Sequence, residues 1–184
     1  MLINGELVVE VDYSACQLRL TYASVGQPDP LAGEVDQRDV KIDLYAGIGM
    51  DRDVAKRALL IMINARHQQS AELALAKWFR DNDRFLNDDK PLELAKRATR
   101  VVASHFAVLK SAFFSDLGLK LQRLDADICA EVQREFRARG IAVLSVHDSF
   151  IVARRHEEEL RAVMSAAFKR GMLSVRDMLV HSPA

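Results

Sequence analysis

The first clear pattern of apolar and polar positions lies near the start of the chain. In ELVVEVDYS, residues 6–14, apolar side chains alternate with mostly polar ones, and Asp12 stands close to the end. A period of two residues is typical of a β-strand with one buried face. We therefore predict a strand that carries a carboxylate at its end.

Helical patterns fill the middle of the chain. Residues 51–80 contain no Gly or Pro and are rich in Ala, Leu, Lys and Arg, which predicts one long helix or two abutting ones. A further helix is predicted from Pro91 to about Phe114, with Asp88 or Asp89 as its N-terminal cap.

A third helical pattern covers residues 122–139. Apolar residues recur there at every fourth position, which predicts one buried stripe. Gly140 follows in the position expected of a C-terminal cap. The stripe consists of Leu124, Ile128, Val132 and Phe136.

The last part of the chain changes pattern twice. In residues 141–155, IAVLSVHDSFIVARR, two apolar arms flank His147 and Asp148, which predicts a hairpin over 141–153 with this pair at or near its tip. An amphipathic helix is predicted from His156 onward. Strands separated by several helices indicate an α+β fold with an antiparallel sheet.

Composition narrows the class of protein. Lys plus Arg and Asp plus Glu number 26 each, so bulk charge alone does not hold this chain on nucleic acid, although a local basic surface is compatible with the total. Cys16 and Cys129 fit neither a zinc spacing nor a disulfide framework, which favours a reduced, cytoplasmic setting. The longest apolar run, residues 58–63, is too short to cross a bilayer, so we expect no membrane partner.

Two carboxylates stand at ends of apolar strands. If the strands carrying Asp12 and Asp148 are neighbours in one sheet, both carboxylates meet at one edge, where divalent cations would relieve their repulsion. Magnesium prefers such oxygen ligands. Two ions about 3.5–4 Å apart are the usual arrangement for in-line displacement at phosphorus.

Four segments resemble the family A (Pol I-like) DNA polymerases, and more distantly the single-subunit phage RNA polymerases. VDYSACQLR (11–19) is similar to motif A, D-Y-S-x-x-E-L-R, and VHDSF (146–150) to motif C. RDVAKRALL (52–60) is similar to the R-x-x-A-K of motif B, and LQRLDADI (121–128) to a Q-x-x-x-A-D-I segment between motifs B and C. All four occur in the family's order.

The resemblance implies a single truncated domain over residues 1–184, with a palm-type antiparallel sheet, packed helices and reduced fingers. The motif B-like helix would span 51–66 and the motif C hairpin 141–153. The thumb and exonuclease domains of the family have no counterpart in the sequence.

The implied activity is template-directed nucleotidyl transfer with two Mg²⁺ ions, on a DNA primer–template and deoxynucleoside triphosphates. Arg52 and Lys56 lie four residues apart and so share a helix face, where a guanidinium fork and a compact charge can bind triphosphate oxygens. The resemblance assigns catalysis and metal binding to Asp12 and Asp148. It assigns nucleotide binding to Arg52, Lys56, Leu60 and Gln17. It assigns primer–template binding to His147, Gln122, Arg19 and Asn64.

The match departs from the family at several positions. Gln17 replaces the Glu that helps to exclude ribonucleotides, so the choice of sugar stays open. Leu60 and Asn64 replace residues of motif B, including the aromatic one that stacks on the nascent pair. Without a thumb we expect weak binding to primer–template, which implies a thumb-bearing chain or a helper protein as a further partner.

Two other functions stay open at this point. A palm remnant without catalysis could dock on nucleic acid or on a replication protein, as the lost aromatic residue and the missing thumb suggest. A nuclease could use the same two carboxylates, since two-metal sites serve both chemistries.

Overall fold

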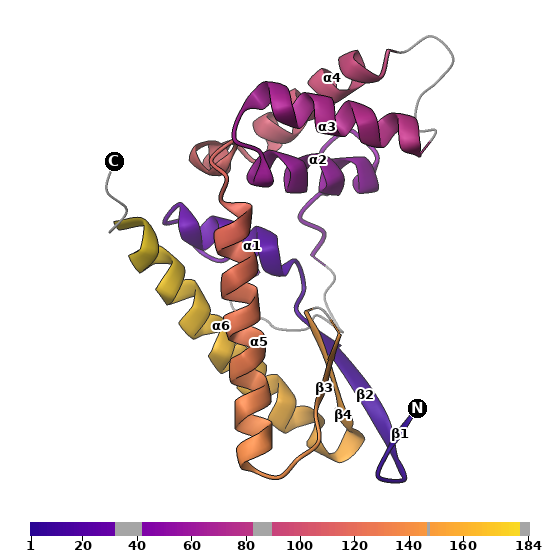
Figure 1. Cartoon of the computed structure of the whole chain (residues 1–184), viewed down its shortest axis with the longest axis vertical. Coiled ribbons are helices and arrows are strands. Elements are labelled where there is room, and N and C mark those ends of the chain that lie inside the picture. Colours follow the sequence, from indigo (N-terminus) through magenta and orange to yellow (C-terminus); the bar gives the residue numbers. More distant parts are fainter. Residues whose placement is uncertain (32–41, 83–89, 147, 181–184) are drawn as a thin grey trace. The chain divides into compact units, whose positions relative to one another are not determined.

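The computed structural model of the chain describes residues 1–31, 42–82, 90–146 and 148–180 (Figure 1). Its internal contacts divide the chain into two compact units. We call residues 1–42 with 121–184 the sheet unit, and residues 43–120 the helical unit. Helices and an antiparallel sheet occur together, so the α+β prediction is confirmed.

Within the described residues the sheet has four strands in the order β1-β2-β4-β3, and every neighbouring pair is antiparallel. The strands are β1 (Leu2–Ile3), β2 (Glu6–Asp12), β3 (Leu144–Val146) and β4 (Ser149–Ala153). Asn4 and Gly5 turn the chain between β1 and β2 with φ of 50° and 81°, which suits this residue pair in a hairpin. The strand predicted in residues 6–14 is confirmed as β2, and the hairpin predicted over 141–153 is confirmed as β3 and β4.

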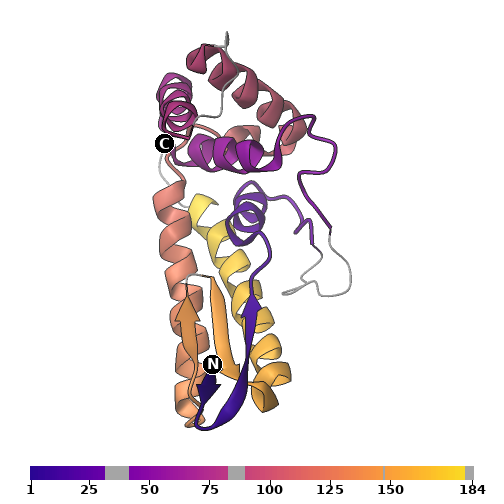
Figure 2. The ribbon, with the colours of Figure 1, turned by 90° about the vertical axis from the view of Figure 1, so that its right-hand side faces the viewer.

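One face of the sheet packs on helices. Val11 lies opposite Phe150, Val9 lies opposite Val152, and Val11, Phe150 and Val152 are fully buried. The helices of this unit are α1 (Cys16–Ser24), α5 (Gly118–Ala138) and α6 (Glu157–Val180), with the short η2 (Arg154–His156) before α6. Figure 2 shows the strands on one side of α5 and α6.

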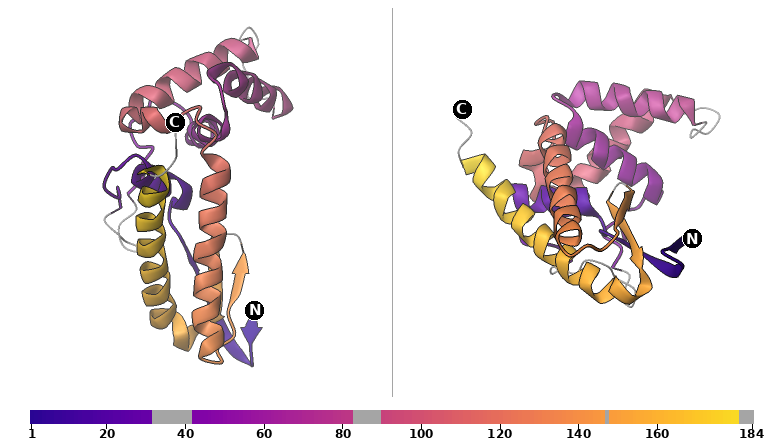
Figure 3. Two further views of the ribbon diagram at one scale, coloured as in Figure 1. Left: turned by 60° about the vertical axis from the view of Figure 1, so that its left-hand side comes forward. Right: turned by 60° about the horizontal axis from the view of Figure 1, so that its bottom comes forward.

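Helices α5 and α6 lie side by side (Figure 3), joined by ion pairs from Arg139 to Glu159 and from Arg170 to Glu131. A side chain at Gly171 would clash with Ile128, so this glycine permits the close approach of the two helices. The predicted stripe of α5 and the inward residues of α6 are buried, namely Leu124, Ile128, Val132, Phe136, Leu160, Val163, Met164, Ala167 and Phe168.

The start of α5 differs from the prediction. The helix begins at Gly118, four residues before the predicted start, and Asp127 lies well inside it. Asp127 faces Arg123 across one turn, at 3.9 Å. Gly140 ends the helix as predicted, with φ of 68° and its N–H donating to the carbonyl of Arg137.

The helical unit contains α2 (Arg52–Asn64), α3 (Gln68–Asp81), α4 (Pro91–His105) and η1 (Ala107–Ala112). Residues 51–80 thus form two abutting helices, the second of the two predicted alternatives. The prediction that α4 continues to about Phe114 was wrong, because Phe106 leaves the helical conformation and buries its ring. Pro91 stands in the first turn as predicted, and the candidate caps Asp88 and Asp89 lie outside the described residues.

In the part of the chain that the structure describes, no helix is long and apolar enough to cross a membrane.

Candidate active site

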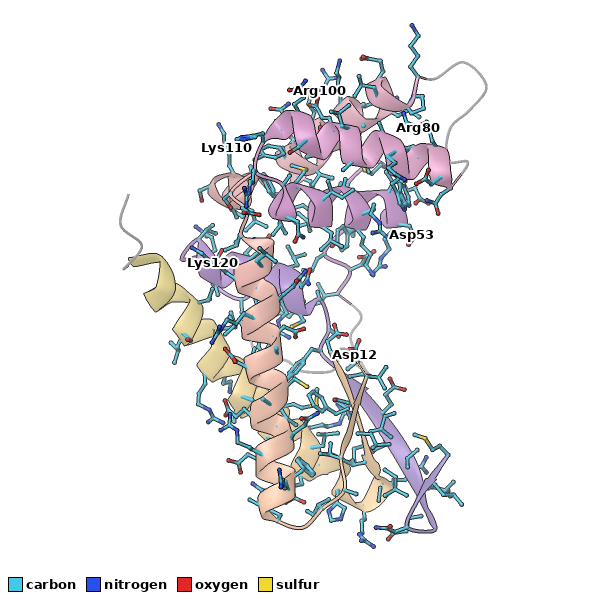
Figure 4. The ribbon with its side chains drawn as sticks, viewed as in Figure 1. Asp12, Asp53, Arg80, Arg100, Lys110 and Lys120 are labelled. Carbon is cyan, nitrogen blue, oxygen red and sulfur yellow. The ribbon has the colours of Figure 1, made fainter. Side chains whose placement is uncertain are left out.

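The register of β2 and β4 brings the two predicted residues, Asp12 and Asp148, to one end of the sheet. Asp12 lies directly opposite Ser149, the residue after Asp148. The N–H of Tyr13 donates to the carbonyl of Asp148 at 3.1 Å, which extends the pairing past the strand ends. Figure 4 shows Asp12 at the end of β2, beside the tip of the β3–β4 hairpin. The hypothesis that the two strands are neighbours is confirmed.

Asp12 points to the sheet face opposite the one that packs on the helices. Val11, its neighbour, is on the buried face, and successive side chains of a strand alternate. The Asp12 side chain is exposed, and Asp148 is half-buried. On the same face Ser149 donates a hydrogen bond to Glu10 at 2.6 Å, so the edge carries several oxygen atoms.

Tyr13 fixes the chain just after Asp12. Its ring is buried against Phe150 and Phe168, with ring centroids at 6.1 and 5.2 Å, and its hydroxyl donates to the carbonyl of Met164 at 2.8 Å. Burial, and then the nearby Cys16 thiol, raise the pKa of the Tyr13 phenol above its usual range. Tyr13 therefore stays neutral and holds the end of β2 against α6.

The structure also brings Cys16 to Asp125, a contact that the sequence analysis missed. The buried thiol of Cys16, at the start of α1, donates to a carboxylate oxygen of Asp125 on α5 at 3.5 Å. Burial, then Asp125, then Asp148 raise the pKa of this thiol. Both residues occupy variable positions of the motifs, so the motifs gave no signal for them.

Arg19 lies in the core, where its guanidinium has no exposure to solvent. It forms a two-pronged ion pair with Asp29, at 2.9 and 2.6 Å, and stacks on the ring of Phe168 at 4.2 Å. The structure thus places Arg19 as an anchor between α1, the segment around Asp29 and α6, with no surface for a nucleic acid strand to contact.

The other predicted residues of the sheet unit lie on α1 and α5. Gln17 is half-buried in the first turn of α1, and Gln122 is exposed on the second turn of α5. His147 lies outside the described residues.

Arg52 and Lys56 share an exposed face of α2, as their spacing predicted. Asp51 caps the helix by accepting the N–H groups of Asp53 and Val54. Arg52 lies 3.2 Å from Asp43. The N–H of Tyr45, and then Arg52, lower the pKa of Asp43.

Leu60 and Asn64 continue the same face toward the end of α2. Leu60 is partly exposed, and the Asn64 amide donates to the carbonyl of Leu60 at 2.7 Å. A side chain at Gly118, which also belongs to the helical unit, would clash with that amide, so Asn64 is packed closely against Gly118. These four residues belong to the helical unit and the two carboxylates to the sheet unit.

Asp12 and Asp148 carry carboxylates, the kind of oxygen ligand that magnesium binds. This ion keeps several waters and commonly takes one or two carboxylates together with substrate phosphates. Asp12 and Asp148 supply two hard carboxylates at adjacent strand ends. No group of three or more Cys, His, Asp or Glu side chains in the described ranges is arranged to hold a metal by itself.

Comparisons with protein-family models, with curated proteins and with solved structures find no match to this chain.

Proposed function

We propose that this chain catalyses template-directed nucleotidyl transfer, in the manner of a DNA polymerase palm with reduced fingers. One observation supports the proposal: the register of β2 and β4, with the Tyr13–Asp148 hydrogen bond, brings Asp12 and Asp148, from the segments that resemble motifs A and C, to the same end of two adjacent strands. Four motifs in the family's order support the specific chemistry.

In this proposal Asp12 and Asp148 would hold two Mg²⁺ ions at the ends of β2 and the β3–β4 hairpin. The ions would neutralise charge on the α-phosphate and lower the pKa of the attacking 3′-hydroxyl. Asp12 is exposed on the open face of the sheet, where substrate can reach it. Tyr13, pinned to Met164 and Asp148, keeps the Asp12 backbone in place.

Arg52 and Lys56 bind the triphosphate in the same proposal. Both are exposed at the N-terminal end of α2, where the helix dipole also favours anions. Binding of a triphosphate would exchange the surface ion pair between Arg52 and Asp43 for a charge-assisted contact with phosphate oxygens.

The primer–template is the macromolecular substrate, and Gln122 is the exposed residue of α5 assigned to it. Arg19 supports the site from the core instead. A thumb-bearing or helper protein in the cytoplasm remains the proposed source of a firm grip on duplex DNA.

The first test is extension of a labelled primer on a DNA template with Mg²⁺ and the four deoxynucleotides. The wild type should extend the primer, and Asp148→Asn should lose at least about 100-fold in rate because a metal ligand is removed. Glu158→Gln, an exposed carboxylate on α6, is the matched control and should behave as the wild type.

Two outcomes would end the polymerase proposal. No extension by the wild type, even with Mn²⁺ and high protein concentration, would favour the binding module without catalysis. Loss of labelled nucleotides from the strand without added triphosphates would favour a nuclease.

Arg52→Ala and Lys56→Ala test the triphosphate assignment separately. Each should raise the KM for deoxynucleotide by about 10-fold, because one charge-assisted contact is lost. An unchanged KM in both variants would end the assignment of Arg52 and Lys56 to the triphosphate, without bearing on Asp12 and Asp148.

A further inference from the structure

The turn between Asp12 and α1 contains a backbone conformation that L-residues seldom adopt. Ala15, the residue before the helix, has φ of 53° and ψ of 37°. A left-handed conformation costs a residue other than glycine about 1–2 kcal/mol. Such a conformation persists only where the surrounding structure holds it.

One side of this turn is held by Tyr13. Its hydroxyl is bonded to Met164, its N–H to Asp148, and its ring is buried. The other side begins at Cys16, the first residue of α1. This helix has no side-chain cap at Ala15 and no acidic residue in its first turn.

Asp125 supplies what the start of α1 lacks. It stands on α5, more than a hundred residues along the chain, and accepts the hydrogen of the Cys16 thiol at 3.5 Å. Its negative charge lies at the positive end of the α1 dipole, which favours it there. Cys16 is 3% exposed, so the thiol is out of reach of bulk water.

The protonation of Cys16 is consistent with this role. Burial and the charges of Asp125 and Asp148 raise the pKa of the thiol, so it keeps its hydrogen and remains a donor at neutral pH.

We propose that Asp125 is a positioning residue for Asp12: by accepting the Cys16 thiol it fixes the far side of the strained turn, and so fixes the carboxylate at the end of β2. The effect of Asp125 on catalysis rests on the proposed function, whereas its effect on divalent-cation binding at Asp12 is independent of that function. Release of Cys16 lets Ala15 relax, and the relaxation moves the end of β2.

Four single variants test the hydrogen bond. Asp125→Ala and Cys16→Ala remove acceptor and donor, whereas Asp125→Asn and Cys16→Ser retain them. The two alanine variants should weaken Mn²⁺ binding, followed by electron paramagnetic resonance, by about 10-fold, as is usual for residues that orient a metal ligand. The two conservative variants should stay near the wild type.

Ala15→Gly separates positioning from a general loss of packing. Glycine adopts the left-handed conformation without strain, so the turn no longer needs its second anchor. The double variant Ala15→Gly with Asp125→Ala should therefore recover most of the Mn²⁺ affinity lost in Asp125→Ala. A packing defect would not be repaired in this way.

Several results overturn the proposal. An equal loss of Mn²⁺ affinity in Asp125→Asn and Asp125→Ala would show that only the charge of Asp125 matters. If Ala15→Gly does not restore the Mn²⁺ affinity lost in Asp125→Ala, strain in the turn is not the cause of that loss. No Mn²⁺ binding by the wild type would end both this role and the proposed metal site.

Primer extension on the same variants distinguishes the two proposals. If Mn²⁺ affinity follows the expected pattern while the wild type extends no primer, the polymerase function fails and the positioning role stands. If the wild type extends primers and the alanine variants match it in rate and Mn²⁺ affinity, the positioning role fails and the polymerase function stands.

Discussion

The sheet unit and the helical unit hold their candidate residues in different ways. In the sheet unit, Asp12 is set by strand register and by the hydrogen bonds that the buried side chains of Tyr13 and Cys16 donate. In the helical unit, Arg52 and Lys56 stand on an exposed helix face, and Arg52 has a surface ion pair with Asp43. Substitutions in the core should therefore disturb Asp12 much more than they disturb Arg52 and Lys56.

Charge also differs between the units, although the chain as a whole is neutral. Residues 43–120 carry thirteen Lys and Arg against ten Asp and Glu, and the sheet unit carries thirteen against sixteen. The basic excess includes Arg97 and Arg100 on α4, both exposed, and Figure 4 labels Arg100. The neutral total thus combines a small basic excess in the helical unit with a small acidic excess in the sheet unit.

The largest expected loss of stability comes from substitution of Arg19. Arg19→Ala removes the buried guanidinium that pairs with the Asp29 carboxylate, 11% exposed, and removes the stacking on Phe168. Breaking a buried ion pair from one side costs about 3–5 kcal/mol in the free energy of unfolding. Urea denaturation would measure the loss. A change below about 1 kcal/mol would show that Arg19 is not the anchor described above.

The next effect concerns alkaline pH and Tyr45 of the helical unit. Burial raises the pKa of this phenol to about 12, whereas an unfolded chain releases the proton near 10. Between pH 10 and 12 the folded state keeps a proton on Tyr45 that the unfolded state has released. The contribution of this phenol to the free energy of unfolding is therefore complete below pH 10 and is lost as pH rises toward 12. Tyr45→Phe should lose less stability than the wild type over this range, measured by urea denaturation at each pH.

A smaller effect, of opposite sign, is expected at Ala15. Ala15→Gly removes the cost of the left-handed conformation and adds flexibility to the unfolded chain, for a net gain of about 1 kcal/mol in the free energy of unfolding. Thermal denaturation would record a higher Tm. A lower Tm would mean that the turn does not store strain.

The smallest effect on stability is expected at the exposed face of α2. Arg52→Ala removes a surface ion pair with side chains 53% and 41% exposed, and should change the free energy of unfolding by less than about 0.5 kcal/mol. Lys56→Ala should do the same. A cost above about 2 kcal/mol in either variant would contradict the contrast between the two units.

The sequence patterns did not predict the end of α4 or the start of α5. The alternation of residues 6–12 and the four-residue stripe of α5 predicted those elements because burial of one face dominates their energy. The end of α4 was missed because Phe106 leaves the helix to bury its ring, which depends on residues far away in the chain. The start of α5 was missed because the helix begins with Gly118, a residue that weakens helix patterns.

The sequence by itself determined the elements that carry Asp12, Asp148 and the Arg52–Lys56 face, because local periodicity and spacing decide which residues share a face. Only the tertiary structure decided that β2 pairs with β4 at Ser149, that Arg19 turns inward to Asp29, and that Asp125 reaches Cys16. These contacts join residues on separate elements, and their hydrogen bonds form only when burial makes an unpaired polar group costly.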